Sequence, residues 1–104
     1  MATVSFSRSA KADLLSIGAY TLETWGAVQA ERYLDSLEGC AKLMAGNPLL
    51  GRPCGRIRTG LYRFETGRHV FFYRSQEDGI LVSRILHQSM LPEDQLFTDV
   101  PPDA

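Results

Sequence analysis

The sequence predicts an α+β domain in which an antiparallel sheet packs on a helical hairpin, with the element order β-α-α-β-β-β. Three observations lead to it. Apolar residues recur every three or four positions in two stretches between residues 8 and 46, a glycine- and proline-rich segment occupies 47–60, and three apolar strand candidates fill 61–87. The 104 residues suffice for one domain with its own core, which we assign to 1–97, followed by a frayed tail at 98–104.

The first half of the chain predicts a short strand and two helices. Residues 3–7 alternate as in a strand, and Ser7 or Ser9 can cap the helix that follows. One helical stripe carries Leu14, Ile17, Gly18, Thr21 and Trp25, widened by Leu15, and a second carries Ala30, Tyr33, Leu34, Leu37, Ala41 and Met44. Only Gly26 interrupts the two stripes, and Gly46-Asn47-Pro48 ends the second, so the helices should form an antiparallel hairpin.

The second half predicts an antiparallel meander of three strands at 61–65, 68–74 and 80–87. Thr66-Gly67 suits a tight turn between the first two, and residues 75–79 suit a five-residue loop before the third. The segment 47–60 should be a loop, with room for a brief strand at 56–58. Pro92 can open a short turn that runs to Phe97.

A sheet built this way has two largely apolar faces. If Glu65 pairs with Arg68 and Arg74 pairs with Ile80, one face carries Tyr62, Phe64, His69, Phe71, Tyr73, Leu81, Ser83, Ile85 and His87, and the other carries Leu61, Arg63, Val70, Phe72, Arg74, Ile80, Val82, Arg84 and Leu86. The helical hairpin can cover only one face, and no further element is large enough for the other. We expect the second face to bind another protein, with Arg63, Arg74, Arg84, Leu61, Phe72 and Val82 as the candidate contacts.

Charge is distributed unevenly although the net charge is only −1. Residues 51–74 hold six arginines against one glutamate, a net +5, and residues 75–104 are net −5. This pattern allows two interpretations: a solvated basic face balanced by an acidic tail, or a surface for a partner, since arginine suits phosphates, carboxylates and interfaces. No run of about 18 apolar residues predicts a membrane span, and the N-terminus lacks an apolar signal core.

Acid–base catalysis is the main enzymatic possibility. RNA cleavage through an activated 2′-hydroxyl needs a base, an acid and cations, and His87 with Arg63, Arg74 and Arg84 supplies those residue types. In an extended strand, however, residues 84 and 87 point to opposite faces, which favours His87 as an ordinary strand-end residue. His69 and His87 lack metal-ligand spacing, and no phosphate loop or dinucleotide motif is present, so we predict no metal and no cofactor.

Two cysteines, Cys40 and Cys54, are too few and too far apart for a metal knuckle or a redox motif. Cys40 lies beside the apolar stripe of the second helix, where a packing role is expected. Two reduced thiols in a cytosolic protein are therefore the favoured interpretation, with a disulfide as the alternative.

Three segments together resemble the ParE branch of the RelE/ParE toxin superfamily: SRSAKADLLSIGAYTLETWGAVQAERYLDSL, GLYRFETGRHVFFYR and ILVSRILHQSMLPEDQL. The resemblance covers roughly residues 4–96, and the family fold has the same element order. It implies the toxin half of a bacterial type II toxin–antitoxin module, a cytoplasmic protein that forms a hetero-oligomer with a ParD-like antitoxin. Such antitoxins wrap a helical and an extended segment over the toxin.

The resemblance also implies a target. ParE-branch toxins with a known target poison DNA gyrase without being enzymes, whereas RelE-branch toxins cleave mRNA on the ribosome with basic sheet residues and often a C-terminal tyrosine. Arg63 and Arg84 occupy sheet positions broadly like those basic residues, but no tyrosine follows Tyr73 and no lysine follows Lys42. The sequence therefore favours a gyrase inhibitor that does not itself bind nucleic acid sequence-specifically, with a RelE-type endoribonuclease as the alternative.

Overall fold

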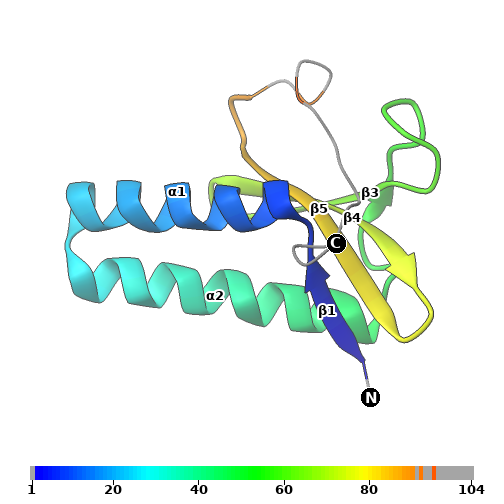
Figure 1. Cartoon of the computed structure of the whole chain (residues 1–104), viewed down its shortest axis with the longest axis horizontal. Helices are drawn as coiled ribbons and strands as arrows, with labels where there is room; N and C mark the ends of the chain where they lie inside the picture. The colour runs from blue at the N-terminus through cyan, green and yellow to red at the C-terminus, as the bar shows by residue number, and fades with distance from the viewer. Residues whose placement is uncertain (1, 91, 93–94, 96–104) are drawn as a thin grey trace.

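Two helices lie across one face of a five-stranded sheet (Figure 1). The structure is a computed structural model that describes residues 2–90, 92 and 95. Its elements, in chain order, are β1 (Thr3–Phe6), α1 (Arg8–Trp25), α2 (Ala27–Gly46), β2 (Arg52–Pro53), β3 (Tyr62–Thr66), β4 (His69–Gln76) and β5 (Gly79–His87). The predicted strand–helix–helix–strands order and the helical hairpin are confirmed.

The helices begin and end where the sequence places their caps. The hydroxyl of Ser7 accepts the amide hydrogen of Ala10 (3.0 Å), so Ser7 rather than Ser9 caps α1. Gly26, with a φ of 92°, separates the two helices in a backbone conformation that favours glycine. The α1 stripe is only partly buried, because Ile17 and Thr21 face the core while Leu15 and Trp25 are exposed. The expectation that both lie on the buried face was wrong.

The sheet is mixed rather than wholly antiparallel. Its strand order is β1-β5-β4-β3-β2, and β1 pairs with β5 in parallel, with Thr3 opposite Gly79. Glycine is required there, because a Cβ on Gly79 would overlap the carbonyl oxygen of Thr3. The short strand in the loop lies at Arg52–Pro53 and not at 56–58, since residues 55–60 form turns.

The strand register determines which residues lie on the sheet face that the sequence predicted for them. Tyr62 pairs with Tyr73 and His69 with His87, each shifted by two residues from the predicted pairing, which leaves the faces unchanged. Beyond a bulge opposite Phe72 and Tyr73, the β4–β5 hairpin closes through a two-residue turn at 77–78, not the predicted five-residue loop. The extra residue of this bulge lies on β5 and reverses the faces of the residues before it. The predicted faces of residues 80–82 were therefore wrong.

Two apolar clusters follow from this register. The larger one lies between the sheet and the helices, and it includes Leu37, Met44, Phe71, Tyr73, Ile80, Val82 and Ile85. The smaller one, on the opposite face, consists of Leu61, Val70, Phe72 and Leu86, with Cys54 and Ile57 packed against it. The second face is therefore covered in part by the loop between β2 and β3. The expectation that no element was available for that face was wrong, because a short irregular loop suffices.

Of the expected C-terminal turn, only Pro92 and Gln95 belong to the described residues. The amide of Gln95 donates a hydrogen bond to the carbonyl of Pro92 (3.1 Å). The rest of the turn to Phe97 and the tail at 98–104 lie outside the described residues. None of the helices in the described part of the chain is long and apolar enough to cross a membrane.

Candidate functional site

The sheet face away from the helices carries arginines over the smaller apolar cluster, and we call it the arginine face. The guanidinium of Arg63 lies 5.6 Å from the ring centroid of Phe72 and 3.6 Å from Glu65, which also pairs with Arg52. The side chain of Arg63 is 30% exposed, and among the described residues its Nε finds no hydrogen-bond partner. Arg74 donates to the carbonyl of Thr59 (3.2 Å). Both arginines thus lie at the surface where the sequence predicted them.

The other predicted contacts on this face are not accessible. Leu61 and Phe72 are each 1% exposed, beneath the loop that carries Cys54 and Ile57. Val82 is fully buried in the helix-side cluster, because the β-bulge turns residues 80–82 toward the helices. The expectation that these three side chains form an open apolar surface was wrong.

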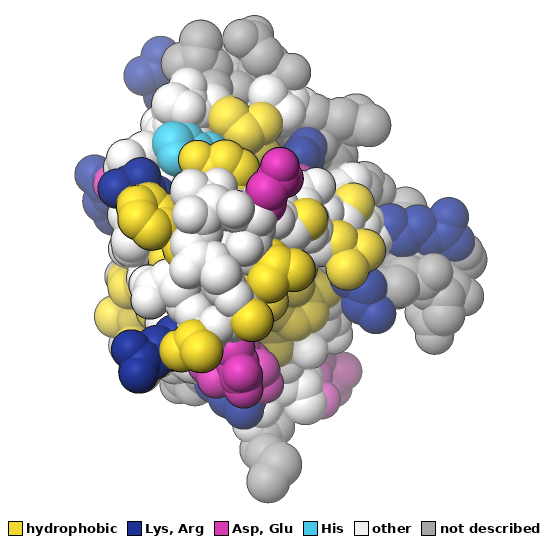
Figure 2. Space-filling view, turned by 90° about the vertical axis from the view of Figure 1, so that its left-hand side faces the viewer, with side chains coloured by type: hydrophobic (Ala, Val, Ile, Leu, Met, Phe, Trp, Pro, Cys, Tyr) yellow, Lys and Arg dark blue, Asp and Glu magenta, His cyan; other side chains and the backbone are white. Residues whose placement is uncertain are grey.

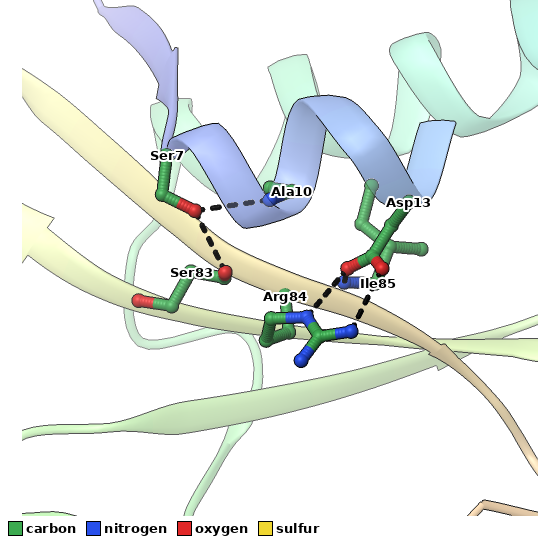
Figure 3. A network of polar contacts seen from close by, with 6 residues as sticks. All are labelled: Ser7, Ala10, Asp13, Ser83, Arg84 and Ile85. Carbon is green, nitrogen blue, oxygen red and sulfur yellow. Dashed lines mark hydrogen bonds and ion pairs between the residues drawn. The ribbon is translucent and has the colours of Figure 1, made fainter. Parts of the chain in front are cut away.

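Arg84 is held at the edge of β5 by α1. Its Nε and Nη2 donate to the two carboxylate oxygens of Asp13 (2.8 and 2.9 Å), which also accepts the amide hydrogen of Ile85 (2.9 Å; Figure 3). Ser7 donates to the carbonyl of Ser83 (2.8 Å). The hydrogen bonds to Asp13 raise the pKa of Arg84 above its usual value, against the effect of burial, and the negative charge of Asp13 adds to the rise. Past the end of β1, the side chains of Ser7 and Asp13 thus form hydrogen bonds with the backbone of β5. Arg84 forms a structural ion pair with Asp13.

His87 lies on the helix side, as the alternation of the strand predicted. It lines an open groove of about 870 Å³ between the outer half of the helical hairpin and the nearby end of the sheet. We call this the histidine groove, and its wall includes Asp13, Ile17, Tyr20, Trp25, Tyr33, Arg68, His69, Ile85, His87 and Met90. Figure 2, viewed from the hairpin end, shows a histidine surface bordered by hydrophobic side chains.

The polar groups of the histidine groove form a chain of contacts. The hydroxyl of Tyr33 lies 2.6 Å from Nδ1 of His69, and the His69 and His87 rings meet edge to face with centroids 5.5 Å apart. Nδ1 of His87 accepts the amide hydrogen of Ser89 (3.1 Å). The pKa of His69 is lowered, first by burial and then by the neighbouring His87, while Asp13 acts in the opposite direction.

A second groove, also of about 870 Å³, lies between β1 and the two helices, and we call it the hairpin groove. Its wall includes Val4, Phe6, Leu14, Leu15, Leu34 and Leu37, with Lys11 and Lys42 at the rim. Lys42 pairs with Glu38 (3.3 Å). Leu15 is 77% exposed, and β1 lies at the end of the sheet. An apolar groove therefore adjoins a strand edge that can accept another strand.

The arginines predicted for RNA cleavage do not lie with His87. His87 and His69 lie on the helix side together with Arg68, whereas Arg63 and Arg74 lie on the arginine face and Asp13 holds Arg84. Among the described residues, no three His, Cys, Asp or Glu side chains are placed to hold a metal ion. Arg63, Arg74 and Arg84 therefore do not line the groove that holds His87, whereas Arg68 does.

Sequence reasoning missed Asp13, Tyr33 and Leu15 as residues of these sites. Tyr33 lies on the apolar stripe of the second helix, and a tyrosine hydroxyl at such a position usually needs a hydrogen-bond partner on the element packed against the helix. That hydroxyl was the signal in the sequence. Asp13 carried no signal, because its role depends on where β1 ends beside β5. Leu15 was assigned to the buried stripe.

Comparison with known proteins identifies the family. Residues 4–92 match the family model described as ParE toxin of type II toxin-antitoxin system, parDE. The chain belongs to the ParE toxin family. It is 41% identical over 85 residues to Toxin ParE1 of Mycobacterium tuberculosis, which covers 81% of this chain and 87% of the relative. It is 42% identical over 86 residues to Toxin ParE1 of Caulobacter vibrioides, which covers 81% and 86%.

A solved structure supports the ParE fold independently. One chain of the chromosomal ParDE toxin–antitoxin system from P. aeruginosa superimposes with a TM-score of 0.69 over 84% of this chain and 96% of the other, at 22% sequence identity. The ParE-like strand–helix–helix–strands fold predicted from the sequence is therefore confirmed both by the family match and by a known structure.

Proposed function

We propose that this ParE-family toxin is held inactive in the cytoplasm by a ParD-like antitoxin and, when released, inhibits DNA gyrase without enzymatic activity. The family match over residues 4–92 carries this proposal. Support for the antitoxin comes from the solved structure of a ParDE system, and support for a binding mechanism comes from Arg63 and Arg74, which lie on the sheet face opposite His87.

The antitoxin is proposed to occupy the hairpin groove and the free edge of β1. An extended segment can add to an edge strand through main-chain hydrogen bonds, and a helix can lay its apolar face in the groove. Lys11 at the rim favours an acidic partner, while Lys42 is paired with Glu38 of the same groove. This location replaces the arginine face as the main antitoxin surface, because Leu61 and Phe72 are already covered there.

The antitoxin surface can be tested with one exposed leucine against another. Leu15 lines the hairpin groove and is 77% exposed, whereas Leu49 is 72% exposed in the loop after α2 and lies outside the groove. Leu15→Glu should weaken binding of the cognate antitoxin, measured by isothermal titration calorimetry, and Leu49→Glu should leave it unchanged. Equal affinities of both variants and the wild type would refute the hairpin groove as the antitoxin site.

The gyrase target is tested separately in vitro. Purified toxin should block supercoiling by gyrase, and equimolar antitoxin should restore it. Normal supercoiling in a large molar excess of folded toxin would exclude gyrase as the target while leaving the antitoxin pairing intact. Intact mRNA on toxin-loaded ribosomes is expected in the same series; cleavage in the ribosomal A site would establish the endoribonuclease alternative instead.

A further inference from the structure

The helical hairpin projects beyond the strands, and its far end is held by few polar contacts. Figure 1 shows the α1–α2 connection lying well past the sheet. Tyr20, Trp25 and Val28 near this end are each more than 60% exposed. Among the described residues, the hydrogen bonds that join α2 near this end to the sheet run through Tyr33, which contacts His69 and Arg68.

The contact between Tyr33 and His69 depends on where His69 carries its hydrogen. The hydroxyl oxygen of Tyr33 accepts the backbone N–H of Arg68 (3.3 Å) and lies 2.6 Å from Nδ1 of His69. In the neutral tautomer with its hydrogen on Nε2, Nδ1 of His69 accepts the hydroxyl hydrogen, so that the hydroxyl both accepts and donates. Burial of His69 lowers its pKa and thereby favours the neutral ring.

His87 contacts Ser89 through the same ring atom. Its Nδ1 lies 2.7 Å from the Ser89 hydroxyl oxygen and 3.1 Å from the Ser89 backbone nitrogen. The two rings meet at 90° with centroids 5.5 Å apart, close enough that a charge on one disfavours a charge on the other. A proton on Nδ1 of His69 would remove the lone pair that accepts from Tyr33.

We propose that Tyr33, His69 and His87 form a proton-sensitive latch that holds the outer half of the helical hairpin against the sheet near neutral pH and releases it on acidification. Other titratable or charged groups of the same groove are Asp13 and Tyr20 of α1 and Arg68 of the β3–β4 turn. Arg84 lies outside the groove lining and pairs with Asp13. Arg68 opposes a further positive charge, and Asp13 favours one. Tyr20 and Trp25 share the groove, so release changes the shape of an exposed aromatic surface.

The direction of the pH dependence follows from His69. Burial and His87 lower the pKa of His69 below its usual value of 6.5, so the released state binds the proton more tightly than the latched state. The latch is therefore stable above about pH 6.5 and weakens as the pH falls toward the lowered pKa. Within that window the population of the released state should rise about tenfold per pH unit, because one proton is taken up.

Amide hydrogen exchange of the free toxin at pH 7.5, 6.5 and 5.5 tests the latch. Protection factors of residues 30–36, corrected for intrinsic rates, should fall on acidification, while those of β4 and β5 and the far-UV circular dichroism stay constant. Fluorescence of Trp25, the single tryptophan of the chain, should shift over the same pH range. Constant protection and constant emission from pH 7.5 to 5.5 in folded wild-type protein would overturn the proposal.

Three variants separate the latch from a general effect of acid. Tyr33→Phe should give low protection at 30–36 that no longer depends on pH. His87→Gln should move the onset of release to higher pH, because a neighbouring positive charge is removed. Tyr20→Phe changes a tyrosine of the same groove outside the latch and should retain the wild-type profile. A wild-type profile in both Tyr33→Phe and His87→Gln would also overturn the proposal. If Tyr33→Phe does not fold, the wild-type and His87→Gln profiles decide.

Discussion

The two faces of the sheet are closed by different means. On the helix side, two amphipathic helices bury side chains such as Leu37, Phe71 and Val82 to 1% or less. On the arginine face, the loop between β2 and β3 covers Leu61 and Phe72 to the same degree, and Arg63 lies over the Phe72 ring. Regular helices form a rigid cover, whereas a loop can adjust. We infer that the first face determines stability and the second presents charge to a partner.

Matched leucine truncations on the two faces give the largest expected effects. Leu37 and Leu61 are each 1% exposed. Leu37→Ala should lower the free energy of unfolding by about 3–5 kcal/mol, because helix and sheet cannot close the cavity. Leu61→Ala should cost nearer 2 kcal/mol, because the covering loop can collapse into the space. Urea denaturation of both variants measures the difference, and an equal or greater loss for Leu61→Ala would contradict the contrast between the faces.

The ion pair at the sheet edge should come next. Asp13→Ala leaves the guanidinium of Arg84 and the amide of Ile85 without their carboxylate and should cost about 1.5–3 kcal/mol of unfolding free energy. Asp35→Ala removes an exposed aspartate of α2 and should change stability by less than about 0.5 kcal/mol. A double-mutant cycle with Arg84→Ala should show coupling, and additive effects would mean that the pair does not stabilise the edge.

A smaller effect is expected where one tyrosine anchors the loop between α2 and β2. The hydroxyl of Tyr73 donates to the carbonyl of Pro48 (2.9 Å) and accepts the amide hydrogen of Gly51 (2.8 Å). Tyr73→Phe should cost about 1–2 kcal/mol by thermal or urea unfolding, since the buried amide of Gly51 and the half-buried carbonyl of Pro48 lose their partner. Tyr62→Phe serves as the control, because the Tyr62 ring packs beside the Tyr73 ring. This substitution should change the free energy of unfolding very little. Equal costs would show that the hydroxyl does not anchor the loop.

Local patterns predicted the elements well, and long-range packing set the limits. Helical stripes, the Ser7 cap and the Gly26 break predicted the hairpin, because each signal lies within a few residues of its consequence. The bulge that turns Val82 toward the helices could not be predicted from the sequence of β5, because this strand has apolar residues at successive positions on both sides of the bulge. Likewise, the pairing of Arg84 with Asp13 joins residues 71 positions apart. The sequence could predict the sheet face on which an arginine lies only where it also predicted the strand register correctly.

The smallest effect on stability, and the most informative for function, is expected on the arginine face. Arg63→Gln and Arg74→Gln combined should change the free energy of unfolding by less than about 1 kcal/mol, because both side chains lie at the periphery of the apolar cluster. If this face contacts the target, the double variant should need about fivefold more toxin to inhibit gyrase supercoiling, roughly 1 kcal/mol. Arg32→Gln, which removes one exposed arginine of α2, is the control for loss of positive charge elsewhere on the surface. Unchanged inhibition by the double variant, or an equal loss with Arg32→Gln, would assign target binding to another surface. Weakened antitoxin binding with unchanged inhibition would instead return the antitoxin to this face.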